Sequence, residues 1–181
     1  MSLRNTESHY GKLTIIMHWL MAAMIIGMIV VGFVMDNMED GDLKWKIYAL
    51  HKATGVILLI LALFRWYWTL SNKKLQPLES YSQLDIKLAH AGKWFLMLLI
   101  LLMPVSGLIM SIAAGKSVNM FGLFTIPGLD EKNHQIAGLF HSVHEIAAWI
   151  ISAVVGLHIL FAFKHHWLSK DATLTRMLGK N

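Results

Sequence analysis

The sequence predicts an all-α integral membrane protein, a four-helix bundle with both termini in the cytoplasm. Of its 181 residues 56% are hydrophobic, at a mean hydropathy of +0.53. Only 15% are charged, whereas charged residues make up about a quarter of an ordinary soluble domain. Four apolar runs are each long enough to cross a bilayer, which takes about 17–25 helical residues. We expect one membrane domain over residues 1–181.

Each apolar run is taken as one span and carries distinctive polar residues. The first run contains His18, and the second has His51 near its start and Arg65 near its end. Pro104 is expected to kink the third, and the fourth carries His158. The Gly-rich loop between the last two spans is expected to form a short helix or a cap over one membrane face. The predicted spans cover residues 13–35, 47–70, 90–114 and 144–164.

The distribution of basic residues orients the bundle. Of the 16 lysines and arginines, 11 lie in the N-terminal segment, the region 65–93 and the C-terminal tail. The other 5 lie in the two remaining loops and their flanks. Because short cytoplasmic loops are enriched in Lys and Arg, we expect both termini on the cytoplasmic side. A net charge of +5 is compatible with nucleic-acid binding, but in a membrane protein the position of the charges matters more than their sum, so we expect lipid and no nucleic acid as a partner.

Four histidines within the spans form two pairs by depth. His144 and His158 are 14 residues apart in the fourth span, which places both rings on one helix face, about 21 Å apart along its axis. Neighbouring spans run antiparallel. His18 and His158 therefore both lie near the inner face of the membrane, and His51 and His144 both lie near the outer face. Two pairs of imidazoles at two depths are the ligands that two bis-histidine haems require in a bundle core.

Other uses of these histidines agree less well with the pattern. A hydrogen bond between helices explains one buried histidine better than four at matched depths. A zinc site needs four ligands around one point, and these four cannot converge across a bilayer. Proton relays usually include an acid within the span, but Glu145 is the only one here and lies at the rim. A non-redox metal-binding or proton-relay membrane protein stays as an alternative. The absence of cysteine excludes disulfides, thiolate-bound iron–sulfur clusters and covalent c-type haem.

Further polar residues are assigned to the edges of the haem sites. Arg65, whose planar guanidinium matches a carboxylate, is expected to bind a propionate of the inner haem, and Lys52 one of the outer haem. His90 competes for inner ligation, but its interfacial position favours the inner haem edge or a quinone headgroup site. His165 and His166 are interpreted as a solvated helix end that also faces a quinone.

One ordered set of motifs runs along nearly the whole chain. It consists of His18-Trp19-Leu20, His51-Lys52-Ala53-Thr54-Gly55 with Arg65, His90, Pro104 with Gly107, Phe121-Gly122-Leu123, His144-Glu145, His158, His165-His166 and Lys170-Asp171-Ala172-Thr173-Leu174-Thr175-Arg176-Met177. This set resembles the bacterial cytochrome b561 family. The resemblance implies a di-haem, quinone-linked cytochrome of the bacterial inner membrane, with haem b ligated by His18, His51, His144 and His158.

The terminal motif is similar to that of the superoxide:ubiquinone oxidoreductases within this family. The resemblance implies an oxidoreductase that passes electrons from periplasmic superoxide through both haems to ubiquinone, with no catalytic residue assigned beyond the haems. On the predicted outer side, 5 basic residues face 7 acidic ones, which does not favour steering of an anion unless Lys52, Lys116 and Lys132 form a local basic patch. A quinol-linked cytochrome serving another periplasmic redox partner therefore stays open as the alternative.

Overall fold

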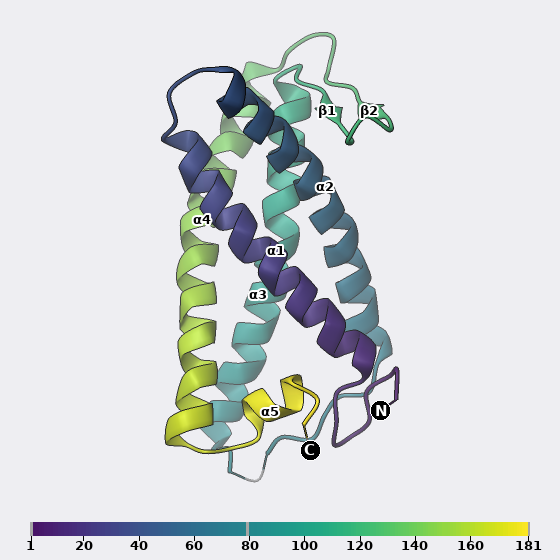
Figure 1. The fold of residues 1–181 in the computed structure, drawn as a ribbon, viewed down its shortest axis with the longest axis vertical. Helices are drawn as coiled ribbons and strands as arrows, with labels where there is room; N and C mark the ends of the chain where they lie inside the picture. Colours follow the sequence, from purple (N-terminus) through teal and green to yellow (C-terminus); the bar gives the residue numbers. More distant parts are fainter. Residues whose placement is uncertain (1, 79, 181) are drawn as a thin grey trace.

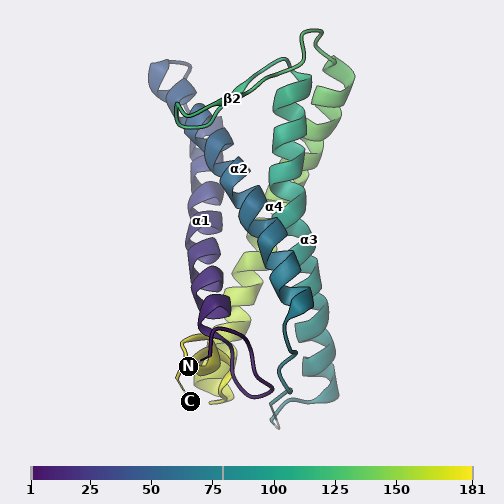
Figure 2. The ribbon, with the colours of Figure 1, turned by 90° about the vertical axis from the view of Figure 1, so that its right-hand side faces the viewer.

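The protein is a bundle of four long helices, seen in a computed structural model that describes residues 2–78 and 80–180 (Figure 1). Each of the four is long and apolar enough to cross a membrane, which confirms the predicted fold class. Both termini lie at the same end of the bundle (Figures 1 and 2), and their cytoplasmic location stays a prediction. The helices are α1 (Lys12–Asp36), α2 (Asp42–Ser71), α3 (Gln83–Ala113) and α4 (His134–Phe163).

The helices α3 and α4 begin well before the apolar runs at residues 90 and 144 that predict them. Local capping decides both starts. At α3, Ser82 and Asp85 form a reciprocal capping box, in which each side chain accepts a hydrogen bond from the other residue's backbone N–H. At α4, Asn133 Oδ1 accepts a hydrogen bond from the backbone N–H of Ile136 at 3.0 Å. Polar first turns therefore extend both helices beyond their apolar segments.

The central helix of the packing is α3. Its backbone runs closely along α4 and along α2, while α1 packs on α2 (Figure 2). The helix continues through Pro104. Between α1 and α4 the contact is made by side chains, among them Phe33 and Trp149, whose ring centroids are 4.8 Å apart. Helix α1 is therefore positioned by α2, and α4 by α3. Side chains of α1 and α4 meet in the space between these two helices.

The loop between α3 and α4 forms a small β-hairpin rather than the short helix considered from the sequence. Strand β1 (Val118–Asn119) pairs antiparallel with β2 (Thr125–Ile126), and Val118 lies opposite Ile126. Val118 and Met120 are buried against Ala53 of α2. These apolar contacts stabilise the hairpin. The hairpin covers the end of the bundle away from the termini (Figure 1), in agreement with the expectation that this loop forms a cap.

The opposite end is covered by the C-terminal segment, residues 164–178. A π-helical turn (Lys164–Leu168) follows α4, and the short helix α5 (Thr173–Met177) lies under the bundle (Figure 1). Trp19 Nε1 donates a hydrogen bond to the carbonyl oxygen of Met177 at 3.0 Å. Arg176 Nη1 donates to the carbonyl oxygen of Gln76 at 3.1 Å. These bonds fasten the segment to α1 and to the loop between α2 and α3.

Substitution Asn133→Ala is expected to destabilise the bundle by about 1 kcal/mol, because it removes the side-chain cap of α4. The measurement is the thermal unfolding midpoint in detergent, which should fall. Gln135→Ala, in the exposed first turn of the same helix, is the matched control and should leave the midpoint unchanged. Equal midpoints for the two variants would show that the cap contributes nothing.

Candidate functional site

Four histidines from three helices meet in two facing pairs. The rings of His18 in α1 and His158 in α4 have centroids 6.1 Å apart and planes inclined by 59°. The rings of His51 in α2 and His144 in α4 have centroids 6.4 Å apart and planes inclined by 82°. The first pair, here called the inner pair, lies toward the termini. The second, the outer pair, lies toward the hairpin, about 21 Å away along α4. The structure thus brings together the histidines that the sequence matches by depth.

The spacing within each pair fits a metal ion held between two imidazoles. A metal–imidazole bond is about 2 Å long and the ring adds about 1 Å from nitrogen to centroid, so opposed ligands have centroids roughly 6 Å apart. Within residues 2–78 and 80–180, no group of three or more His, Asp or Glu side chains is placed to hold an ion alone. Two facing imidazoles fit a group that brings its own donor atoms, as a porphyrin does.

His144 is oriented by α3. Its Nδ1 lies 3.0 Å from the carbonyl oxygen of Met103 and 3.0 Å from Oγ of Ser106, which is fully buried. The Ser106 hydroxyl donates its own hydrogen to Met103. Because a carbonyl oxygen only accepts, Nδ1 of His144 carries the proton, and Nε2 keeps its lone pair for a metal ion.

Two glycines let the rings of the outer pair lie close to a helix backbone. At Gly107 of α3, an added Cβ would lie 3.0 Å from Cε1 and 3.2 Å from Nδ1 of His144. At Gly32 of α1, an added Cβ would lie 3.5 Å from Cε1 of His51. A larger residue at Gly107 would therefore push the imidazole out of its present position, whereas Gly32 leaves only ordinary contact distance.

His51 has a buried ring nitrogen, Nδ1, without a hydrogen-bond partner among the described residues. A polar group buried without a partner costs about 1–3 kcal/mol, so such groups usually have a reason. The ring lies in an apolar span and faces a second imidazole. This is the arrangement expected of a side chain whose partner is a bound group rather than another residue.

Arg65 and Lys52 lie near opposite pairs. Arg65 Nη1 donates to the carbonyl oxygen of Thr14 at 3.2 Å, one helical turn before His18. Lys52 directly follows the outer-pair residue of α2, and its Nζ donates to the carbonyl oxygen of Ser117 at 2.8 Å. In the part of the chain that the structure describes, neither cation has a carboxylate within 4.0 Å. Each therefore keeps hydrogen-bonding capacity for an anion beside its pair.

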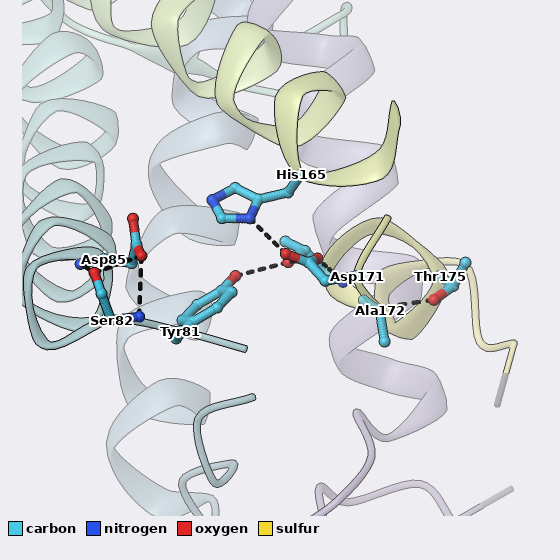
Figure 3. A network of polar contacts seen from close by, with 8 residues as sticks. Tyr81, Ser82, Asp85, His165, Asp171, Ala172 and Thr175 are labelled. Carbon is cyan, nitrogen blue, oxygen red and sulfur yellow. Dashed lines mark hydrogen bonds and ion pairs between the residues drawn. The ribbon is translucent and has the colours of Figure 1, made fainter. Parts of the chain in front are cut away.

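The remaining predicted residues lie away from the two pairs. His90 is exposed, and its Nε2 accepts a hydrogen bond from Trp94 Nε1 at 3.1 Å. The interpretation of His165 as part of a solvated helix end is wrong. Its side chain is only 14% exposed, and its Nδ1 lies 2.6 Å from Asp171 Oδ2 (Figure 3). The cause is the reversal of the chain after the π-helical turn, which brings Asp171 back onto the end of α4.

Three residues without a role in the sequence analysis contact these side chains. Ser106 orients His144, and Trp19 packs edge-on against His18 with ring centroids 5.2 Å apart. Asp171 binds the end of α4. Ser106 is detectable in the sequence as a hydroxyl within an apolar run. Asp171 is not, because its contact depends on how the chain turns after α4.

Comparison with known proteins identifies the family. The sequence profile described as prokaryotic cytochrome b561 matches residues 9–180. The chain belongs to this family. Cytochrome b561 homolog 2 of Escherichia coli (strain K12) is 34% identical over 100% of this chain and 97% of its own length. Probable superoxide oxidase CybB of Yersinia pestis is 29% identical, over 94% of this chain and 96% of its own. Cytochrome b561 homolog 1 of E. coli is 31% identical over 53% of this chain and 54% of its own.

Membership of the cytochrome b561 family makes this chain a membrane electron-transfer protein that binds b-type haem, located as a multi-pass protein in the inner membrane. It also excludes the non-redox alternative considered from the sequence. When bound, a haem supplies one-electron redox chemistry, and the protein supplies ligands, orientation and access. The facing imidazoles, the glycine beside His144 and the His51 nitrogen that has no partner among the described residues fit such a group.

Substitution Gly107→Ala is expected to lower the haem content and to shift the reduced-minus-oxidised spectrum, because the new Cβ meets the ring of His144. Changes next to a metal-bound histidine typically weaken binding by about 10–100-fold. Gly92→Ala on the same helix is the control, since an added Cβ there has no neighbour within 4 Å. A wild-type spectrum and haem-to-protein ratio in Gly107→Ala would show that the close approach is not needed.

Proposed function

We propose that this protein conducts electrons across the inner membrane through two b haems, one bound by each histidine pair. His18 and His158 would hold the inner haem, and His51 and His144 would hold the outer haem. The observation that carries the proposal is the matched geometry of the pairs, with centroids 6.1 and 6.4 Å apart on separate helices. Each pair offers the two imidazoles of a bis-histidine haem, and the family binds haem of the b type.

Neighbouring side chains then have defined tasks. The Met103 carbonyl holds the Nδ1 proton of His144, so that Nε2 would be free to bind the iron of a haem. Arg65 is a cation within a span and without a carboxylate among the described residues, which supports a bidentate contact with a propionate of the inner haem. Lys52 is assigned to a propionate of the outer haem. With the pairs about 21 Å apart, the path covers most of a hydrocarbon core about 30 Å thick.

The orientation of the electron path across the membrane is inferred from the distribution of basic residues. The 11 basic residues near the termini and the region 65–93 favour a cytoplasmic location for that end of the bundle. The inner pair then lies toward the cytoplasm, and the hairpin with the outer pair faces the periplasm. Both ends of the chain lie at the same end of the fold, as an even number of spans requires (Figure 1).

We further infer that superoxide is the donor and ubiquinone the acceptor. Two superoxide ions each give up one electron and leave as O₂, and the two electrons with two protons convert one ubiquinone into ubiquinol. Support comes from the relative named probable superoxide oxidase, which is similar over 94% of this chain. Further support comes from three lysines that α2 and the loop between α3 and α4 carry at the hairpin end of the bundle.

These three lysines, here called the lysine patch, are Lys52, Lys116 and Lys132. Lys52 binds the carbonyl oxygen of Ser117, next to Lys116, at 2.8 Å. Lys132 lies over Gly115, where an added Cβ would approach its Cγ to 2.9 Å. A local positive patch attracts a small anion even where the wider surface is acidic, because field lines concentrate near the site.

The alternative is that a basic redox protein, rather than superoxide, exchanges electrons with this chain at the periplasmic end. The loop between α1 and α2 and its flanks carry Asp36, Glu39, Asp40 and Asp42, of which Asp40 pairs with Lys44 at 3.1 Å. Acidic loops of this kind complement a positive protein surface and steer its approach. Under this alternative, a quinol-linked cytochrome serves a periplasmic partner. Superoxide then reduces the haems slowly, with little dependence on ionic strength.

Replacing one ligand of each pair is expected to remove one haem at a time. His158→Leu should abolish the inner haem and His51→Leu the outer haem, and the double variant should carry none. The measurement is the pyridine haemochrome content per chain together with the reduced spectrum. His90→Leu is the control and should keep the full content, because His90 is exposed and bonded to Trp94. Loss of haem from His90→Leu, with normal content in the other two, would contradict the pairing.

Neutralising the lysine patch is expected to slow haem reduction by superoxide about tenfold or more at low salt, because electrostatic steering raises association rates by about 10–10³-fold. The variant carries Gln at Lys52, Lys116 and Lys132. The rate is followed by stopped-flow absorbance at increasing ionic strength, and its salt dependence should flatten. Gln at Lys12, Lys73 and Lys74, near the opposite end, makes the same charge change. Equal slowing by both sets would refute steering by the patch.

A further inference from the structure

The turn of the β-hairpin carries large apolar side chains that the described part of the chain leaves uncovered. This turn, residues 120–124, is here called the hairpin tip. Phe121, Leu123 and Phe124 are 51%, 85% and 59% exposed. The 13 residues from 117 to 129 carry no formal charge, since the flanking charges are Lys116 and Asp130. An exposed apolar cluster of this kind marks a contact with a membrane or with another protein.

The hairpin lies beside the apolar part of α2. Val118 and Met120 are buried with Ala53, and Ile57 of the next turn packs against the same cluster. The apolar run of this helix begins at Ile47, so Ala53 lies six residues, or roughly 9 Å along the helix axis, inside it. Figure 1 shows the hairpin reaching sideways past α2, and Figure 2 shows it crossing the upper part of that helix. The hairpin tip therefore projects from the side of the bundle at a depth where α2 is surrounded by lipid.

The start of the hairpin lies beside residues typical of a membrane–water interface. Trp45 and Tyr48, in the first two turns of α2, have ring centroids 5.5 Å apart, and Trp45 is 51% exposed. Trp and Tyr are enriched where a protein crosses the edge of a bilayer. The Nζ of Lys116, two residues before β1, lies 5.9 Å from the centroid of the Trp45 ring. The chain therefore enters the hairpin at this edge and continues toward the apolar part of α2.

Backbone N–H groups of the hairpin tip are bonded within the hairpin. In lipid, an unpaired N–H group has no water to bond with, so a segment that enters lipid must satisfy these groups itself. The N–H of Met120 donates to the carbonyl oxygen of Phe124 at 2.8 Å, and the N–H of Leu123 to that of Met120 at 3.0 Å. The N–H of Gly122 donates to Asn119 Oδ1 at 2.6 Å. The tip can thus leave water without losing these three bonds.

The backbone at Phe121 adopts a conformation that is rare for an aromatic residue. Its φ is +55°, in the left-handed region, and Gly122 follows with a φ of +82°. Non-glycine residues in this region persist where the placement of a side chain has a use. Across this turn the exposure changes sharply, from 6% at Met120 to 51% at Phe121. The turn therefore separates a residue that packs on α2 from residues that face outward.

A protein partner agrees less well with these observations. Interfaces between proteins have a polar rim and about ten direct hydrogen bonds on average. The hairpin tip offers no charge, and three of its N–H groups are already bonded within the hairpin. A water-soluble partner would also have to reach a surface that lies beside the apolar run of α2. Lipid is the partner that matches both the chemistry and the depth of the tip.

We propose that the hairpin tip inserts into the bilayer at the boundary between headgroups and acyl chains, where Phe121, Leu123 and Phe124 contact lipid. Apolar segments that lie in this layer are typically buried by about 5–10 Å. The contact keeps β1 against α2, and with it the carbonyl oxygen of Ser117 that Lys52 binds. The inserted tip is thus a second anchor of the hairpin, beside its packing on Ala53. The proposal depends neither on haem ligation nor on the identity of the electron donor.

The test uses the fact that the chain contains no cysteine, so that one introduced cysteine is the only labelling site. Leu123→Cys is labelled with bimane in the full-length holoprotein, in nanodiscs of phosphatidylethanolamine and phosphatidylglycerol. Two quenchers are compared, a phospholipid with a nitroxide high on its acyl chain and iodide in the buffer. The nitroxide lipid should quench the label several-fold more strongly than iodide does. Phe124→Cys is the second tip variant and should behave in the same way.

Two further single-cysteine variants calibrate the quenching. Ile60→Cys, at a 61% exposed position in the α2 span, gives the value for lipid, and Glu131→Cys, exposed in the polar loop before α4, gives the value for water. Haem content and folding are checked in every variant by the visible spectrum. Quenching by iodide at both tip positions, as at Glu131→Cys, would overturn the proposal. Protection of the tip from both quenchers would also overturn it, because a second copy or another protein would then cover the tip.

Discussion

A buried imidazole must find a partner for each ring nitrogen, and this requirement governs the arrangement of the bundle. In hydrocarbon an unpaired polar group costs several kcal/mol. The structure meets the demand at His144 by giving one nitrogen to the Met103 carbonyl and turning the ring toward a second imidazole. Helix α3 carries no proposed ligand, yet it supplies the carbonyl, the buried hydroxyl of Ser106 and the open backbone at Gly107. Helix α3 therefore fixes the orientation of the His144 ring of α4.

The two ends of the bundle are closed by different chemistry. At the hairpin end, Val118 and Met120 are buried on α2, and Lys52, which follows His51 in the chain, is hydrogen-bonded to the carbonyl oxygen of Ser117. At the other end, the C-terminal segment is held by polar contacts and contains a His–Asp pair. The hairpin end is thus closed mainly by apolar contacts, and the end with the termini by hydrogen bonds and one ion pair.

Much of this arrangement is predictable from the sequence, because hydropathy and helical period together give each residue a depth and a face. These two quantities suffice for the four spans and for bringing His18 to His158 and His51 to His144. They do not predict the hairpin, which two-residue strands form only because Val118 is buried against α2. They also miss the contact of His165, since it depends on a chain reversal after α4 that no periodic pattern encodes. The early starts of α3 and α4 depend on caps outside the apolar runs.

The most direct test of this account is the number of b haems per chain in the purified protein, measured as pyridine haemochrome against amino-acid analysis. Both imidazole pairs have ring spacings close to those of opposed axial ligands, at 6.1 and 6.4 Å. We expect two low-spin haems per chain. A single haem per chain in protein saturated with haem would contradict it, because one of the two facing pairs would then have no role in ligation.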